Sequence, residues 1–482
     1  MIKLNKIHQA ALIFCLVFVI FTYAEFQADQ LPKYDAYYHA KMAEKFPSGE
    51  FFSQQFPWLS QTVLAQNYGN MHFLFHVFLS PFTLLGLAGV KLATVLLAAL
   101  FFLIFFLIAY EFSEEHAFLG TLLMMTSAEF LFRLLLPRAI SLSLILLFLG
   151  LYFLIKKKYY ALGALSFIYV WTYTGFVTLL IFVLVKFFID AQDNNYDFKG
   201  IFYAYGGVCL GLLINPYFPS NLSTFYTQIF KISFGAAVTG GGEWATMDSM
   251  VFIVSTLFIL VPLVYAIVFT KRMDSKENSE GRFLLALMFL GLLFFFSARR
   301  GVEFFVPLAA LFIIYAFKDV HIELYLKRII YPVFGLVVLL VLFNHMIVLP
   351  VILFDSPNHK IQPCAEWLNN NTEQNSVVYN PRWDDFPALF YYTDHNYFIS
   401  GLDPNFMYYN DPEKYDLYNK INVGEESSSK IITEFNATYV VYTIYDDSER
   451  IKDNSSTIFS NSEIAFSDES CYVLKISEEQ QN

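Results

Sequence analysis

The sequence predicts a helical bundle that spans a membrane many times, followed by a soluble α/β domain. Of its 482 residues, 56% are hydrophobic and 15% are charged, whereas soluble globular chains are roughly 45–50% apolar and about 25% charged. The excess is uneven, because residues 10–350 form long apolar runs and residues 351–482 have an ordinary, acidic composition. We therefore expect a transmembrane domain over 1–350 and a soluble domain over 351–482.

The formal net charge is −11, and most of the acidic excess lies in the predicted soluble domain. A nucleic-acid partner requires a basic face, so this class of function is not expected.

The first span is expected over 9–25. It starts next to Lys3 and Lys6, and basic residues at a span end favour the cytoplasmic side. The residues Tyr23–Phe26 make a poor cleavage site, which predicts an uncleaved span. Residues 26–90 would then form a large external loop.

The remaining topology depends on Lys156–Lys158, the densest basic cluster of the membrane part. This cluster should be cytoplasmic. Three spans are predicted between residue 89 and the cluster, and three crossings from the outer side end in the cytoplasm. Residues 71–89 should therefore lie along the membrane instead of crossing it. In total we expect about eleven spans of about 20 residues, which places the C-terminal domain outside the cytoplasm. The spans are predicted near 9–25, 91–110, 117–132, 139–155, 159–174, 176–189, 201–216, 250–270, 282–298, 303–318 and 329–350.

The soluble domain alternates short apolar runs with turn signals. Val377–Tyr379, Tyr439–Tyr442 and Tyr472–Leu474 are typical of strands, and Ala365–Leu368 of a helical turn. Outside the cytoplasm Cys364 and Cys471 can form a disulfide; otherwise they are two separate buried thiols. The sequence leaves both possibilities open.

Under this topology several unusual polar residues share the outer side. Asp35 follows the first span, where a carboxylate persists only if it is solvated or used; capping a helix is the structural alternative. Arg133 and Arg138 flank Pro137, and a snorkelling anchor would explain Arg133. His72 and His76 have i, i+4 spacing, which suits either a metal or an interfacial helix.

Two further segments lie on this side. Gly240–Trp244 belongs to the external loop 215–249, and three glycines there indicate either a flexible connection or a mobile lid. Arg299 and Arg300 are adjacent in an external turn, where positive charge is disfavoured. This pair therefore indicates an anion, such as a phosphate.

Together these groups predict a chemistry. Carboxylates can act as general base or hold a divalent cation, arginines can bind a phosphate, and apolar spans can hold a lipid tail. A sugar linked to a lipid phosphate fits all three features.

At these residues the chain resembles the GT-C superfamily of polyprenyl-phosphate-dependent glycosyltransferases, and within it the catalytic subunit of oligosaccharyltransferase. The likeness covers most of the chain in order. Its motifs are Tyr34–His39 in the first loop, the aromatic-glycine break Trp171–Phe176, the loop Gly242–Trp244 with Asp248–Ser249, the arginine motif Arg299–Phe305, and Trp383–Asp385 in the soluble domain.

The resemblance implies roles for individual residues. Asp35 and Glu243 would be catalytic, and both would hold a divalent cation, Mg²⁺ or Mn²⁺. Arg299 and Arg300 would bind the donor phosphate together with Arg138. Contacts with the substrate or acceptor are expected from His39, Trp244, Trp383 and Asp384.

Two departures leave part of this open. The segment Leu136–Ser141 has no carboxylate where the family has a paired acidic motif, so a metal would lack ligands and Arg138 can supply the charge instead. The soluble domain has one tryptophan where the family has two, so the acceptor can be a protein, a glycan or a lipid. The competing hypotheses are a transporter or flippase, which usually has repeated halves, and a non-catalytic subunit that binds polyprenyl lipids.

Overall fold

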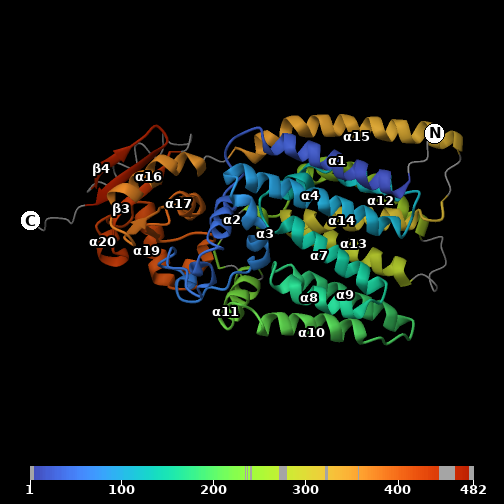
Figure 1. The fold of residues 1–482 in the computed structure, drawn as a ribbon, viewed down its shortest axis with the longest axis horizontal. Coiled ribbons are helices and arrows are strands. Elements are labelled where there is room, and N and C mark those ends of the chain that lie inside the picture. The colour runs from blue at the N-terminus through green and yellow to red at the C-terminus, as the bar shows by residue number, and fades with distance from the viewer. Residues whose placement is uncertain are drawn as a thin grey trace, which may run out of the picture.

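The computed structural model describes residues 5–233, 235, 237–238, 242–270, 279–320, 324–355, 358–444 and 462–476. Most of this part is helical, and a five-stranded sheet lies toward the C-terminus. Figure 1 shows the long helices side by side in one bundle, with the sheet and its helices at one end of the bundle. The predicted fold class, a helical membrane bundle with a C-terminal α/β domain, is confirmed.

Ten helices of the described chain form the bundle. Helix α14 is its most enclosed member, and nearly all of its side chains are buried. The bundle helices are α1 (Lys6–Glu25), α4 (Gly86–Tyr110), α7 (Ile140–Ile155), α8 (Tyr159–Val170), α9 (Phe176–Gln192), α10 (Lys199–Leu213), α12 (Ser249–Thr270), α13 (Ser279–Ser297), α14 (Val302–Ala316) and α15 (Leu324–Leu353).

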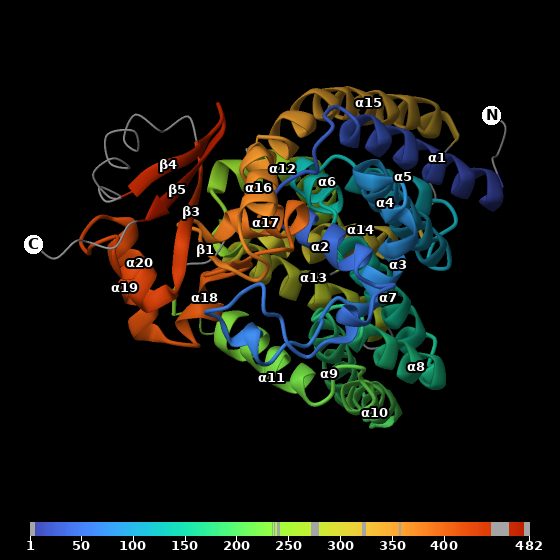
Figure 2. The ribbon, with the colours of Figure 1, turned by 60° about the vertical axis from the view of Figure 1, so that its left-hand side comes forward.

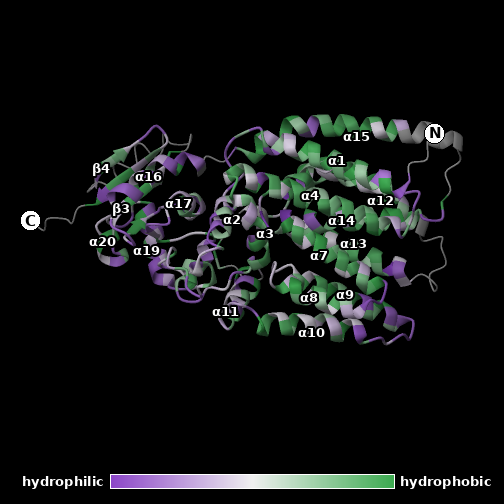
Figure 3. Ribbon diagram, in the orientation of Figure 1, coloured by the Kyte–Doolittle hydropathy of each residue, from purple (hydrophilic) through white to green (hydrophobic). Residues whose placement is uncertain are grey.

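The bundle helices are mostly hydrophobic, as Figure 3 shows by its colouring, and many of their large apolar side chains are exposed. On α15, for example, Leu336, Leu339 and Phe343 are 58%, 62% and 65% exposed. Such a surface is unfavourable in water, and it identifies an integral membrane protein. Within the described residues, five helices are long and apolar enough to cross a membrane, or six with one bent pair. The expectation of about eleven spans stays a prediction.

The bent pair replaces the straight span predicted over 117–132. Helices α5 (Ala117–Met124) and α6 (Ala128–Leu134) meet at an angle of 82°. The hydroxyl of Ser127 accepts a hydrogen bond from the Phe130 amide and thereby caps α6, because serine favours helix starts over helix interiors. Both halves of the bent pair contact α14.

Short elements fill the space between the bundle and the sheet domain, as the labels of α2, α3 and α11 show in Figure 1. They come from the first loop, the loop before α12 and the turn before α14. These elements are α2 (Asp35–Glu44), η1 (Gly49–Phe52), η2 (Val63–Ala65), α3 (Phe73–Thr83), α11 (Ser220–Tyr226), η3 (Thr227–Ser233), η4 (Gly242–Trp244) and η5 (Arg299–Gly301).

The C-terminal sheet has the strand order β2-β1-β3-β5-β4. Strand β1 pairs in parallel with β2 and β3, whereas β5 pairs antiparallel with β3 and β4. The three predicted strands and the helical turn are confirmed, since they fall in β1, β3, β5 and α16. The elements are η6 (Asn358–Ile361), α16 (Gln362–Asn371), β1 (Val377–Tyr379), η7 (Trp383–Asp385), α17 (Phe386–Tyr392), β2 (Tyr397–Phe398), α18 (Pro404–Tyr408), α19 (Pro412–Asn422), α20 (Lys430–Phe435), β3 (Ala437–Thr443), β4 (Ser462–Ser467) and β5 (Cys471–Ile476).

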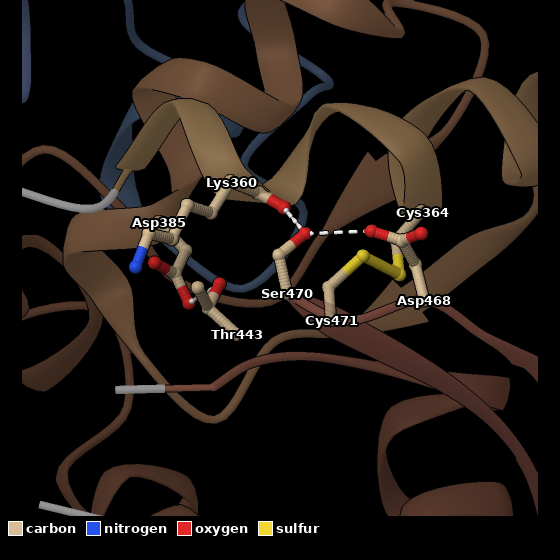
Figure 4. Close-up of a disulfide and its surroundings, with 7 residues drawn as sticks. All are labelled: Lys360, Cys364, Asp385, Thr443, Asp468, Ser470 and Cys471. Carbon is tan, nitrogen blue, oxygen red and sulfur yellow. Dashed lines mark hydrogen bonds between the residues drawn. A yellow bond between two sulfur atoms is a disulfide. The ribbon is translucent and has the colours of Figure 1, made fainter. Parts of the chain in front are cut away.

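A disulfide joins Cys364 of α16 to Cys471 of β5, and both cysteines are fully buried. Beside it the Ser470 Oγ lies 2.6 Å from the Lys360 carbonyl oxygen and 2.9 Å from the Asp468 carboxylate, so its one hydrogen can be donated to either acceptor (Figure 4). The pairing that the sequence left open is therefore formed. Disulfides persist in oxidising compartments, which agrees with an extracytoplasmic domain.

The first loop is bound firmly to the sheet domain, and Figure 2 shows α2 beside α17. The Lys45 ammonium lies 2.7 Å from the Asp394 carboxylate, and the Trp58 indole donates to the Asp394 carbonyl at 2.8 Å. Leu59 also pairs with Phe398 as a parallel bridge at the β2 edge. These contacts hold α2 in a fixed position over the bundle.

Candidate active site

A cavity of about 480 Å³ lies where the bundle, the loops and the sheet domain meet. Its wall on the bundle side is apolar, whereas its rim carries arginine, aspartate, histidine and tyrosine side chains. The apolar wall comes from three helices: α9 contributes Val177, Ile181 and Phe182, α13 contributes Leu290 and Phe294, and α14 contributes Phe304 and Leu308. The cavity therefore has an apolar part between these three helices, called here the apolar arm, and charged side chains at its rim, or mouth.

Asp35 and Arg138 form an ion pair at the rim. Their Oδ2 and Nη2 atoms lie 2.8 Å apart, and the side chains are 30% and 19% exposed. Asp35 is the first residue of α2 and does not cap it, since the N-cap residue is Tyr34. A carboxylate in the first helical turn is favoured by the helix dipole, so the start of α2 is a favourable position for Asp35 at the cavity rim.

Arg133 and Glu303 form a second pair, deeper in the wall. The Arg133 Nε donates to Glu303 Oε1 at 2.6 Å, and the two side chains are 6% and 3% exposed. The bend between α5 and α6 directs Arg133 inward, so it is not the snorkelling anchor that its sequence position allows. Arg133 also lines the cavity.

Arg300 is positioned by two aromatic side chains. Its guanidinium lies 4.5 Å from the Trp244 ring centre, and its Nη2 donates to the Tyr173 hydroxyl at 2.5 Å. The Arg299 amide donates to the Ala245 carbonyl at 3.0 Å, which joins η5 to η4. Stacking and hydrogen bonding fix the plane of an arginine and suit it to phosphate recognition.

Tyr173 belongs to the break between α8 and α9, as the resemblance implies for Trp171–Phe176. Gly175 makes this break compact, because a Cβ there would lie 2.6 Å from Ser143 Oγ and 2.8 Å from the Tyr169 hydroxyl. No larger residue fits without movement. The break brings Tyr173 to the cavity mouth, a role that the sequence did not assign to it.

Three histidines of the first loop gather beneath the rim. His39 Nδ1 and His76 Nε2 are hydrogen-bonded at 2.8 Å, and the His39 and His72 ring centres are 4.9 Å apart. Burial, followed by the charges of Arg138 and Arg300, lowers the pKa of His72 to about 3. Burial and the neighbouring histidines also hold the pKa of His39 well below its usual value. These rings are therefore neutral at physiological pH, and His39 and His72 line the cavity in that form.

The sheet domain contributes Leu402, Asp403 and Phe406 to the cavity wall. Leu402 has φ of +65°, a left-handed conformation that costs a leucine about 1 kcal/mol. Trp383 and Asp384, which the resemblance favours for acceptor contacts, are not among the described residues of the wall. Asp384 instead pairs with Arg382 at 2.8 Å.

The other predicted residues differ in whether they line the cavity. Asp35, His39, Arg138, Trp244 and Arg300 line the cavity. Arg299 is absent from the described wall; it pairs with Glu129 at 3.3 Å and is 46% exposed.

The backbone of Glu243 belongs to η4 beside Trp244. Its side chain, like Gly240 and Gly241, lies outside the described part of the chain. The catalytic role expected for Glu243 therefore stays a prediction.

A divalent cation such as Mg²⁺ needs carboxylate or other oxygen ligands around it. In the described part of the chain, no group of three His, Cys, Asp or Glu side chains is arranged to hold a metal ion. The carboxylate of Asp35 is already engaged by a cation, the Arg138 guanidinium. Among the described side chains this donor set does not supply a protein-held Mg²⁺ or Mn²⁺ site; Glu243, the second ligand that the resemblance implies, has its side chain outside them.

No family model and no curated protein sequence matches the chain. Solved structures do match it. The archaeal oligosaccharyltransferase AglB from Archaeoglobus fulgidus, in complex with an inhibitory peptide and a dolichol-phosphate, has a TM-score of 0.63 at 12% identity, over 99% of this chain and 75% of that chain.

Two other glycosyltransferase structures also match the chain. ArnT from Cupriavidus metallidurans, bound to undecaprenyl phosphate, has a TM-score of 0.62 at 12% identity, with 98% of each chain covered. Arabinofuranosyltransferase AftD from Mycobacteria has a TM-score of 0.55 at 13% identity, over 98% of this chain and 40% of that chain. At these identities the likeness shows the fold: the protein has the fold of the GT-C glycosyltransferases and resembles oligosaccharyltransferase.

Proposed function

We propose that this protein is a membrane glycosyltransferase that moves a sugar or oligosaccharide from a polyprenyl-phosphate-linked donor to an acceptor. The N-terminus would be cytoplasmic and the reaction extracytoplasmic, with a protein, a glycan or a lipid as acceptor. The observation that carries the proposal is the composition of one cavity. It joins a carboxylate, a stacked arginine and an apolar arm within the membrane bundle.

Each part has a role in this proposal. The arm between α9, α13 and α14 would hold the isoprenoid chain, and Arg300 would bind the phosphate. Asp35 would accept the proton of the acceptor's hydroxyl or amine while the acceptor oxygen or nitrogen attacks the anomeric carbon of the sugar. The bond from this carbon to the phosphate oxygen breaks, and the lipid phosphate leaves with the bonding electrons. Dolichol-phosphate and undecaprenyl phosphate in the AglB and ArnT structures support the lipid class.

The decisive test is sugar transfer by the purified full-length protein with Asp35→Asn. A positioned general base contributes about 10²-fold to 10⁴-fold, so the rate should fall at least about 10²-fold. The control is Glu50→Gln, which changes a 62%-exposed carboxylate of the same loop and should leave the rate unchanged. Full transfer by Asp35→Asn would remove this residue from the mechanism. Donor binding without turnover by the unmodified chain would favour the non-catalytic subunit.

A further inference from the structure

The resemblance implies a metal ion at Asp35, whereas the structure places the Arg138 guanidinium there. The Asp35 and Arg138 side chains approach to 2.8 Å at the cavity mouth. Ion pairs of this length are among the stronger hydrogen-bonded contacts in proteins. A divalent cation on the same carboxylate would have to displace a guanidinium or lie directly beside it.

The surroundings are also unfavourable for a metal. Arg300 lines the same cavity, as do Arg133, whose charge is compensated by Glu303, and Asp403. Burial lowers the pKa of His72 most, and the charges of Arg138 and Arg300 lower it further, so these two guanidiniums act on this part of the rim. Like charges at short range in a poorly solvated site repel strongly, so this rim should reject a further dication.

The position of Arg138 is set by the backbone. Its amide donates to the Leu136 carbonyl at 2.7 Å in the tight turn that contains Pro137, just before α7 begins at Ile140. In the family, this external loop carries paired carboxylates. In this chain the corresponding loop carries Arg138, so a group that would bind a cation is replaced by a group that is itself positively charged.

We propose that Arg138 takes the place of a divalent cation at Asp35, so that this protein works without a metal. The guanidinium holds the carboxylate in position and supplies positive charge for the leaving phosphate. The inference rests on the proposed glycosyl transfer, but its first test does not require activity.

The first test is metal content and binding in the full-length protein in detergent. Elemental mass spectrometry should find no stoichiometric divalent metal, and Mn²⁺ titration followed by electron paramagnetic resonance should show no site that Asp35→Asn removes. One metal per chain, lost in Asp35→Asn, would overturn the inference. This result decides the question even if no donor supports sugar transfer.

The second test uses transfer activity. EDTA should leave the rate unchanged, and Arg138→Gln should lower it about 10²-fold with no recovery in Mg²⁺ or Mn²⁺. Arg138→Lys should recover part of the loss, since lysine keeps the charge but not the fork geometry. The control is Arg282→Gln, which lies in α13 and pairs with Asp193. Loss of activity in EDTA with recovery in Mg²⁺ would refute the proposal. Absence of transfer with every donor would refute the proposed function instead.

Discussion

The cavity wall contains two arginine–carboxylate pairs of similar length in very different surroundings. The Arg133–Glu303 side chains are 6% and 3% exposed, whereas the Arg138–Asp35 side chains are 19% and 30% exposed. The first pair joins α6 to α14, and although Arg133 also lines the cavity, both side chains are almost fully buried. The second pair faces the cavity and can exchange partners with a substrate. Burial, rather than distance, thus separates a pair that supports the fold from one suited to catalysis.

The largest effect is expected from breaking the buried pair. Glu303→Ala leaves the Arg133 charge buried without its carboxylate, which should lower the free energy of unfolding by about 3–5 kcal/mol. Asp35→Ala at the rim should cost no more than about 1 kcal/mol. Denaturant unfolding in detergent measures both changes.

A double variant provides the control for this prediction. Replacing both Arg133 and Glu303 by apolar residues of similar volume, Arg133→Met with Glu303→Leu, should restore most of the stability. Equal losses in Glu303→Ala and Asp35→Ala would mean that burial does not distinguish the two pairs.

The third arginine of the wall sharpens the comparison, since Arg300 is held by a hydroxyl and a ring. Tyr173→Phe removes the hydroxyl that accepts from Arg300. A hydrogen bond to a charged group contributes about 1.5–3 kcal/mol, so kcat/KM for the donor should fall about tenfold or more. Tyr160→Phe, at a 79%-exposed position, is the control. An unchanged kcat/KM would show that the Tyr173 hydroxyl is not needed to hold the guanidinium.

The smallest effect concerns pH. Because the pKa of His72 is lowered to about 3, the unfolded chain binds a proton below about pH 6.5 that the folded chain does not. Stability is therefore full above this pH and should decrease as the pH falls, by about 1 kcal/mol at pH 5.5 from this residue. Burial also lowers the pKa of His39 and His76, so His72→Gln should reduce, but not abolish, the dependence measured from pH 7.5 to 5.5. The exposed His8→Gln should leave it unchanged. A dependence that His72→Gln leaves unchanged would assign it to other groups.

Several features were predictable because they depend on local sequence. Asp35 and Arg138 follow from their positions at the ends of apolar runs, and the sheet strands from alternating patterns between turns. The break around Gly175 was recognisable by its aromatic-glycine composition. In each case the residues that determine the feature are neighbours in the chain.

The rest depends on tertiary geometry. Arg133 and Glu303 are 170 residues apart, and they meet only because α5 and α6 bend by 82°. Arg299 and Arg300 are adjacent and chemically identical, so only the geometry of η5 decides that Arg300 enters the cavity. Leu402 reaches the wall through docking of the whole sheet domain. No periodicity in the sequence encodes such arrangements.

The bridge between Leu59 and Phe398 has a consequence for biogenesis. The Phe398 amide donates to the Trp58 carbonyl at 2.9 Å, and the Ser60 amide donates to the Phe398 carbonyl at 2.9 Å. Residues made early in translation thus complete the edge of a sheet made last. The first loop can make this bridge only after β2 has been synthesised, and a chain truncated before β2 would leave the loop with an unpaired, aggregation-prone edge.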